Sequence, residues 1–181
     1  MSYTIVKIKS SYNDTVTLLL KELISFNIEV IDNPNYLIFK HNYNNVDDIK
    51  SLILSLSSEQ MIDIFCYETI TIYPDEELNL VINLFNSINN GFYTLKEIIL
   101  NNINIINKKS FIDLILKGSG ITKDFIEEYI KYDLNISKAS KEMYIHRNTM
   151  IYKLDKLKEV SGFDLRCFKD AYILYSLIIN K

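Results

Sequence analysis

Residues 135–165 have the sequence NISKASKEMYIHRNTMIYKLDKLKEVSGFDL. It predicts a short helix from about Ile136 to Met143, a connection of three residues at 144–146, and a longer helix from about Arg147 to Val160. The apolar positions of the longer helix recur at helical spacing and predict its buried face: Met150, Leu154 and Leu157. A short helix, a tight turn and a longer helix form the helix-turn-helix arrangement.

Polar side chains open the longer helix, where a helix-turn-helix meets base edges in the major groove. Arg147 can bind guanine through two hydrogen bonds, and Asn148 can do the same for adenine. Lysines further along this face suit phosphate oxygens, and the amides that open the shorter helix favour anions. The predicted DNA-contact residues are Asn135, Ser137, Lys138, His146, Arg147, Asn148, Thr149, Tyr152, Lys153 and Lys156. For His146 two interpretations stay open, a phosphate contact and a cap of the second helix.

The charges are unevenly distributed along the chain. Residues 1–120 hold 9 lysines and arginines against 14 aspartates and glutamates, a net charge of −5, whereas residues 121–181 hold 11 against 9, a net of +2. Within 136–158 six basic residues stand against two acidic ones. Such a patch is typical of a nucleic-acid-binding surface, with a merely solvated helix face as the alternative.

The N-terminal part alternates between β-like and helical patterns. Residues 3–9, 28–31, 36–40 and 62–73 read as strands, and the second and third are joined by the turn residues Asp32-Asn33-Pro34-Asn35. Helical apolar stripes lie between the first and second strands, at 16–24, and between the third and fourth, at 46–56. The resulting βαββαβ order is that of a ferredoxin-like domain.

Helices are expected between this domain and the helix-turn-helix. One follows Pro74, one is opened by Thr94 after Gly91 ends the first, and one starts at Ser110. The run Gly118-Ser119-Gly120 is the expected hinge. The sequence therefore predicts an α+β chain: a ferredoxin-like domain at 1–75, connecting helices at 76–120, and an all-α helix-turn-helix domain at 121–181. In that last domain a helix capped by Thr122 precedes the pair, and a helix from about Phe168 to Ile179 ends it.

On the residues of 135–154 and the run Ser161-Gly162-Phe163-Asp164-Leu165, the C-terminal part resembles the helix-turn-helix of the PucR and sugar-diacid regulator (CdaR) family. The likeness covers about 55 residues, with Lys153 where the family usually has arginine. The resemblance implies a bacterial transcription regulator, and it implies a GGDEF-like domain before the helix-turn-helix. The hairpin at 31–37 lacks the Gly-Gly-Asp/Glu-Glu-Phe signature, so that domain is expected to be degenerate and without cyclase activity.

Other classes of protein find little support in the residues. Cys66 and Cys167 have no metal-ligand spacing and are expected to be buried apolar residues, and no catalytic set surrounds the two histidines. We expect no enzyme activity, no cofactor, no metal and no membrane segment, and a cytoplasmic location. The expected partners are double-stranded DNA and a second copy of the chain, since one helix-turn-helix contacts few base pairs. An effector or a protein partner on the N-terminal domain stays open, as does a protein-interaction module that does not use its helix-turn-helix for DNA.

Overall fold

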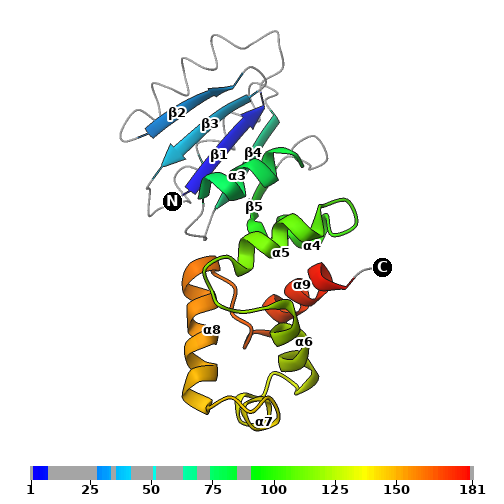
Figure 1. The fold of residues 1–181 in the computed structure, drawn as a ribbon. Helices are drawn as coiled ribbons and strands as arrows, with labels where there is room; N and C mark the ends of the chain where they lie inside the picture. The colour runs from blue at the N-terminus through cyan, green and yellow to red at the C-terminus, as the bar shows by residue number, and fades with distance from the viewer. Residues whose placement is uncertain are drawn as a thin grey trace. The chain divides into compact units, whose positions relative to one another are not determined.

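A computed structural model of the chain describes residues 2–7, 28–33, 36–41, 51, 63–68, 74–84 and 91–179 (Figure 1). Two compact units divide the chain. The first comprises residues 1–69 and 85–95, and the second comprises residues 70–84 and 96–181.

The described elements of the first unit form one five-stranded sheet in the order β2-β3-β1-β4-β5. The strands are β1 (Ser2–Lys7), β2 (Ile28–Asn33), β3 (Tyr36–His41), β4 (Asp63–Glu68) and β5 (Gly91–Thr94). The first strand of the chain is therefore central, and it pairs antiparallel with β3 and β4. The predicted hairpin is confirmed, because β2 and β3 pair antiparallel down to Asn33 opposite Tyr36.

The fifth strand was not predicted from the sequence. Gly91 was expected to end a helix, but it begins β5, which runs parallel to β4 with Gly91 opposite Phe65. A four-residue strand shows too little alternation to be recognised, and its partner lies more than twenty residues earlier. Of the two predicted helices, 16–24 lies outside the described residues, and within 46–56 the structure describes Ser51, which is helical.

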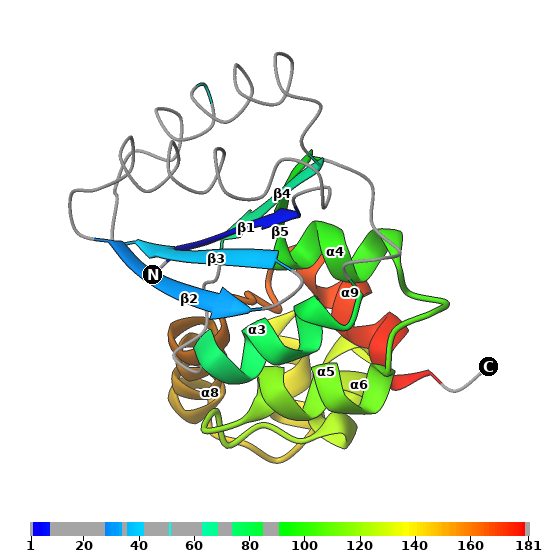
Figure 2. The ribbon, with the colours of Figure 1, turned by 90° about the horizontal axis from the view of Figure 1, so that it is seen from above.

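The second unit is helical throughout its described elements. They are α3 (Pro74–Ile82), α4 (Leu95–Asn101), α5 (Lys108–Leu116), α6 (Lys123–Lys131), α7 (Ile136–Glu142), α8 (Arg147–Ser161) and α9 (Phe168–Ile178). α5 contacts α3, α8 and α9 (Figure 2), and by its contacts α6 lies against α7 and α9. The helices between 96 and 120 thus pack with the helix-turn-helix in one unit and do not form a bare connecting segment.

Local capping explains where two of these helices start. Thr122 accepts a hydrogen bond from the Phe125 amide at 3.2 Å and begins α6 where the sequence predicted. α5 starts earlier than predicted, because Asn107 is its cap and accepts from the Ser110 amide at 3.2 Å. Within the described part of the chain, no helix is long and apolar enough to span a bilayer.

The core of the helical unit lies where the apolar stripes predicted it. The buried face of α6 consists of Phe125, Ile126 and Tyr129, with Ile130 half-buried. Met150, Leu154 and Leu157 of α8 are fully buried. This packing fixes which face of α8 points away from the unit, and the polar residues of α8 lie on that outer face.

Candidate nucleic-acid interface

The turn between α7 and α8 is built by backbone hydrogen bonds that end α7. The Tyr144 amide donates to the Lys141 carbonyl at 3.3 Å, and the Ile145 amide donates to the Ser140 carbonyl at 2.9 Å. Tyr144 adopts the left-handed conformation, with φ of 54°. This pair of bonds around a left-handed residue is the Schellman motif, which turns the chain sharply after a helix. A tight connection is therefore present as predicted, but it spans residues 143–146 because α7 ends at Glu142.

α7 itself is held close to its neighbours by a small buried face. Ala139 is fully buried, and α7 contacts both α6 and α8. A small side chain at this position lets the helices approach closely. Ser140 is also buried, and its hydroxyl donates to the Ser137 carbonyl at 3.1 Å.

His146 caps α8. Its Nδ1 accepts a hydrogen bond from the Asn148 amide at 3.2 Å. This confirms the capping interpretation of His146. Because Nδ1 is an acceptor, the neutral ring carries its proton on Nε2, which leaves that nitrogen as a donor on an exposed side chain. Capping α8 therefore leaves the Nε2–H group of His146 available as a hydrogen-bond donor.

The first turn of α8 carries three exposed polar residues in succession, Arg147, Asn148 and Thr149. Within the described part of the chain, their side chains take part in no hydrogen bond or ion pair. The first turn of α8 also lacks an acidic residue. The helix thus offers donors and acceptors at the end where its dipole is positive.

The start of α7 holds the other predicted contacts. Asn135 caps α7, and its side-chain oxygen accepts from the Lys138 amide at 3.0 Å. Ser137 is exposed. The ammonium group of Lys138 lies 2.8 Å from the Asp133 carboxylate, and this hydrogen bond raises the pKa of Lys138. Asn135, Ser137 and Lys138 thus lie at the start of α7, and Lys138 already has an anionic neighbour.

The three outer residues further along α8 differ in what they contact. Tyr152 is exposed. Lys156 pairs with Glu159 one turn on, at 3.0 Å. Lys153 bends back over its own domain: its ammonium group donates to the Gly120 carbonyl at 2.8 Å and lies 5.8 Å from the centre of the Phe125 ring. Lys153 therefore ties α8 to the segment that precedes α6.

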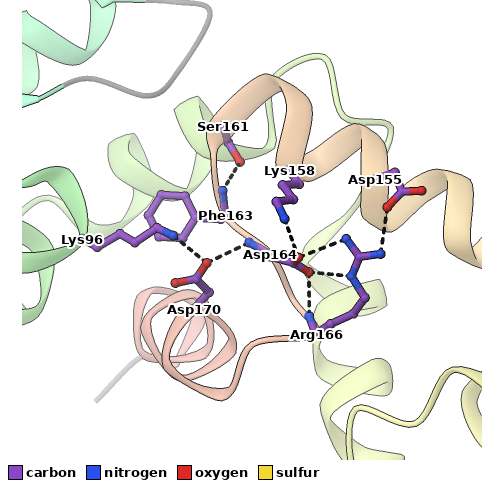
Figure 3. Close-up of polar contacts among 8 residues, drawn as sticks. All are labelled: Lys96, Asp155, Lys158, Ser161, Phe163, Asp164, Arg166 and Asp170. Carbon is purple, nitrogen blue, oxygen red and sulfur yellow. Dashed lines mark hydrogen bonds and ion pairs between the residues drawn. The ribbon is translucent and has the colours of Figure 1, made fainter. Parts of the chain in front are cut away.

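At its other end, α8 stops at a tight turn (Figure 3). Gly162 ends the helix with φ of 73°, a conformation that favours glycine. The Ser161 hydroxyl donates to the Leu157 carbonyl at 2.7 Å and accepts from the Phe163 amide at 3.2 Å. The Ser-Gly-Phe-Asp-Leu run is thus a helix stop that buries Phe163.

A polar network follows this stop, and we call Asp155, Lys158, Asp164 and Arg166 the Arg166 cluster. Arg166 binds Asp164 through two hydrogen bonds of 2.7 and 3.0 Å and reaches Asp155 of α8 at 2.8 Å (Figure 3). Lys158 lies 3.2 Å from Asp164. The hydrogen bonds from Arg166 lower the pKa of Asp164 to about 2, and the same pairing raises the pKa of Arg166.

Asp170 continues the network into the unit. This carboxylate is 3% exposed and pairs with Lys96 of α4 at 2.6 Å, and it accepts from the Asp164 amide at 2.8 Å. The Lys96 ammonium group also lies 5.1 Å from the centre of the Phe163 ring. None of these roles was predicted from the sequence, because each pairing depends on the tertiary packing of residues distant in the chain.

The aromatic residues of the helical unit differ in their exposure. Tyr129 is buried, and its hydroxyl donates to the Leu134 carbonyl at 2.8 Å, whereas Tyr144 is 96% exposed. The expectation of a buried position is wrong for Cys167, which is exposed. Phe168, Tyr172 and Tyr175 are exposed and line a pocket of about 300 Å³ between α6 and α9.

No cluster of residues suited to hold a metal ion occurs among the residues that the structure describes. The candidate interface consists of the polar side chains, backbone amides and helix ends at the starts of α7 and α8. Its geometry is that of a helix-turn-helix whose second helix begins with exposed side chains. Within the described residues, these side chains form no hydrogen bond or ion pair.

Comparison with known families supports this class. Residues 124–178 match the PucR C-terminal helix-turn-helix domain, which confirms the predicted resemblance for this part of the chain. The chain is 30% identical over 60 residues to the carbohydrate diacid regulator of Escherichia coli, a match that covers 33% of the chain and 16% of that regulator. It is 27% identical over 68 residues to the Bacillus subtilis protein YxkF, with 38% of the chain and 23% of YxkF covered.

These relatives are matched over less than a quarter of their own length. Among solved structures, a regulator of polyketide synthase expression from Bifidobacterium adolescentis aligns with 97% of the chain and 78% of its own, at 13% identity and a TM-score of 0.46. The GGDEF-like character of the N-terminal part stays a prediction.

Proposed function

We propose that the chain is a sequence-specific, DNA-binding transcription regulator whose recognition helix is α8. The observation that carries the proposal is the first turn of α8, where Arg147, Asn148 and Thr149 are exposed and have no side-chain partner in the described part of the chain. Arginine and asparagine are the side chains that discriminate guanine and adenine in the major groove. The match of this segment to a family of regulators supports the same assignment.

The phosphate contacts are proposed around this helix start. Ser137 and the exposed Nε2 of His146 can donate to phosphate oxygens, and Tyr152 and Lys156 lie further along α8. Lys138 and Lys156 are held by exposed ion pairs, which contribute little and are readily exchanged for a phosphate. Asn135 and Lys153 contribute by positioning, since the first caps α7 and the second binds the Gly120 carbonyl.

The working form is proposed to be a dimer. Two copies related by a two-fold axis would place two recognition helices in major grooves on one side of the duplex, about 10 base pairs or a multiple of that apart. Footprints should therefore come in pairs. A single asymmetric footprint made by a protein that is monomeric in light scattering would contradict the dimer.

For the N-terminal part we propose a ferredoxin-like domain of degenerate GGDEF type, without enzyme activity, which supplies a dimer contact, an effector site or a partner surface. The central position of β1, antiparallel to β3 and β4, supports this fold. The proposed location of the regulator is the bacterial cytoplasm, where its DNA is.

A protein-interaction module is the alternative function. The observation in its favour is the pocket between α6 and α9, where Phe168 is 76% exposed beside Tyr172 and Tyr175. Exposed aromatic side chains are enriched at protein interfaces. In this alternative the helix-turn-helix would not bind DNA.

Salt dependence of DNA binding separates the two functions. If the full chain makes about six phosphate contacts as a dimer, its affinity for a duplex should fall roughly a thousandfold between 50 and 200 mM salt. Fluorescence anisotropy with a labelled duplex measures this directly. A flat salt response, or no binding at the lower salt concentration, would favour the interaction module.

A further inference from the structure

Tyr144 is the most exposed large hydrophobic residue of the described chain, at 96%. Its backbone is nevertheless firmly placed. The amides of Met143, Tyr144 and Ile145 donate in turn to the carbonyls of α7 at Ala139, Lys141 and Ser140. The structure therefore fixes where the side chain begins and gives it nothing to pack against.

The backbone conformation of Tyr144 makes its side chain harder to explain by stability. A φ of 54° is disfavoured for a residue with a Cβ, and glycine is the usual choice at this position of a Schellman motif. Two other non-glycine residues of the described chain share this conformation, Asp133 and Leu134. Each has an internal role, since Asp133 pairs with Lys138 and the Leu134 carbonyl accepts from Tyr129. Tyr144 has no such partner within the described residues.

The place of Tyr144 in the turn points to a role at the DNA. It lies two residues before His146, so their Cα atoms are at most about 7 Å apart. It therefore stands at the edge of the surface formed by the start of α8. The charged residues within three positions are Lys141 and Arg147, which are exposed and would favour a phosphate, and Glu142, which would oppose one.

We propose that Tyr144 is a DNA-backbone contact, whose phenol hydroxyl donates a hydrogen bond to a phosphate oxygen at the edge of the groove that α8 enters. This inference rests on the proposed function. A neutral donor suits this place, because it binds a phosphate without adding a cation beside Lys141. The bases of a duplex are stacked on one another, so the hydroxyl and not the ring face is the group that reaches the DNA.

The test compares Tyr144→Phe and Tyr144→Gly with the unchanged full chain, on a random-sequence 30-base-pair duplex at several salt concentrations. A phosphate contact does not depend on base sequence, so no operator is needed. Both variants should bind about tenfold more weakly, because each loses a hydrogen bond to a charged acceptor. The slope of affinity against salt should stay the same, since no cation is removed. The thermal midpoint of Tyr144→Gly should not fall, because glycine accepts the left-handed backbone.

Tyr172→Phe on α9 is the matched control, since it removes an exposed phenol hydroxyl from another helix. It should leave DNA binding unchanged. If the unchanged chain binds the duplex but both Tyr144 variants bind equally well, the inference is overturned and the proposed function stands. If Tyr144→Phe binds normally and Tyr144→Gly does not, the ring and not the hydroxyl makes the contact, which also overturns it. Absence of binding by the unchanged chain overturns both.

Discussion

The polar residues at the two ends of α8 differ in whether their side chains have partners within the fold. At the start, Arg147, Asn148 and Thr149 are exposed, and within the described chain their side chains have no partner. Past the end, Arg166 binds Asp164 and Asp155, and Asp170 binds Lys96. Arg166 therefore forms ion pairs within the fold, whereas Arg147 is available to bind another molecule.

This difference separates structural from functional polar residues better than residue type does. Arg166 lies among carboxylates that satisfy its guanidinium group, so removing it should harm the fold. The Arg147 guanidinium group binds no carboxylate within the described chain. Removing it should therefore leave the fold intact. The comparison predicts that stability and DNA binding respond separately to changes at the two ends.

The largest effect on stability is expected from Asp170→Ala. This change leaves the Lys96 ammonium group and the Asp164 amide without their acceptor in a buried place, which should cost about 2 to 4 kcal/mol. Urea denaturation of the full chain, followed by circular dichroism, measures the loss. Asp170→Asn is the control, because it keeps an acceptor for the amide and should lose less. An equal loss in both variants would place the effect in packing.

A smaller effect is expected on acidification. The pKa of Asp164 is lowered to about 2 in the folded chain, so its contribution is present above the unfolded value near 3.8 and is lost as pH falls from there through 2. The contribution should be about 1 to 2 kcal/mol at neutral pH. It is measured as the difference in unfolding free energy between the unchanged chain and Asp164→Asn at pH 7, 4 and 2.5. A difference that does not shrink at low pH would show that the ionised Asp164 carboxylate does not stabilise the fold.

The smallest effect is expected at the two left-handed residues that flank α8. Gly162→Ala should destabilise by about 1 kcal/mol, because its φ of 73° is costly for alanine. At the other end, Tyr144→Gly should be neutral or slightly stabilising, because its φ is 54° and its side chain buries nothing. Thermal melts of both variants test this opposition. A loss in Tyr144→Gly as large as in Gly162→Ala would show that Tyr144 supports the fold.

The helical part of the fold could be predicted because its signals are local. Thr122, Asn135 and His146 cap the helices that follow them, and the stripe of Met150, Leu154 and Leu157 marks the buried face of α8. β5 was missed because a strand of four residues exists through its pairing with β4. Local signals reveal helices, whereas pairing between distant segments must be seen in the structure.

The candidate site followed the same division. The exposed start of α8 could be predicted from local sequence. The apolar stripe fixes which face of the helix is buried, so the polar residues that precede the stripe are expected to face solvent. The hydrogen bond from Lys153 to the Gly120 carbonyl could not be predicted. In the sequence, a lysine on an outer helical face gives the same pattern whether its ammonium group faces solvent or binds a carbonyl. The Arg166 cluster was missed for the same reason, because its members converge through the turn at Gly162.

A side-by-side measurement of Arg147→Ala and Arg166→Ala tests whether α8 is the recognition helix. The full chain and both variants are titrated by anisotropy into a duplex selected from a random library and into its scrambled form, and their melting temperatures are recorded. Arg147→Ala should melt normally and lose about 1 to 3 kcal/mol of binding to the selected duplex, with less loss on the scrambled one. Arg166→Ala should lose about 1 kcal/mol of stability and keep its preference for the selected duplex. Unchanged binding by Arg147→Ala would contradict the assignment of α8 as the recognition helix.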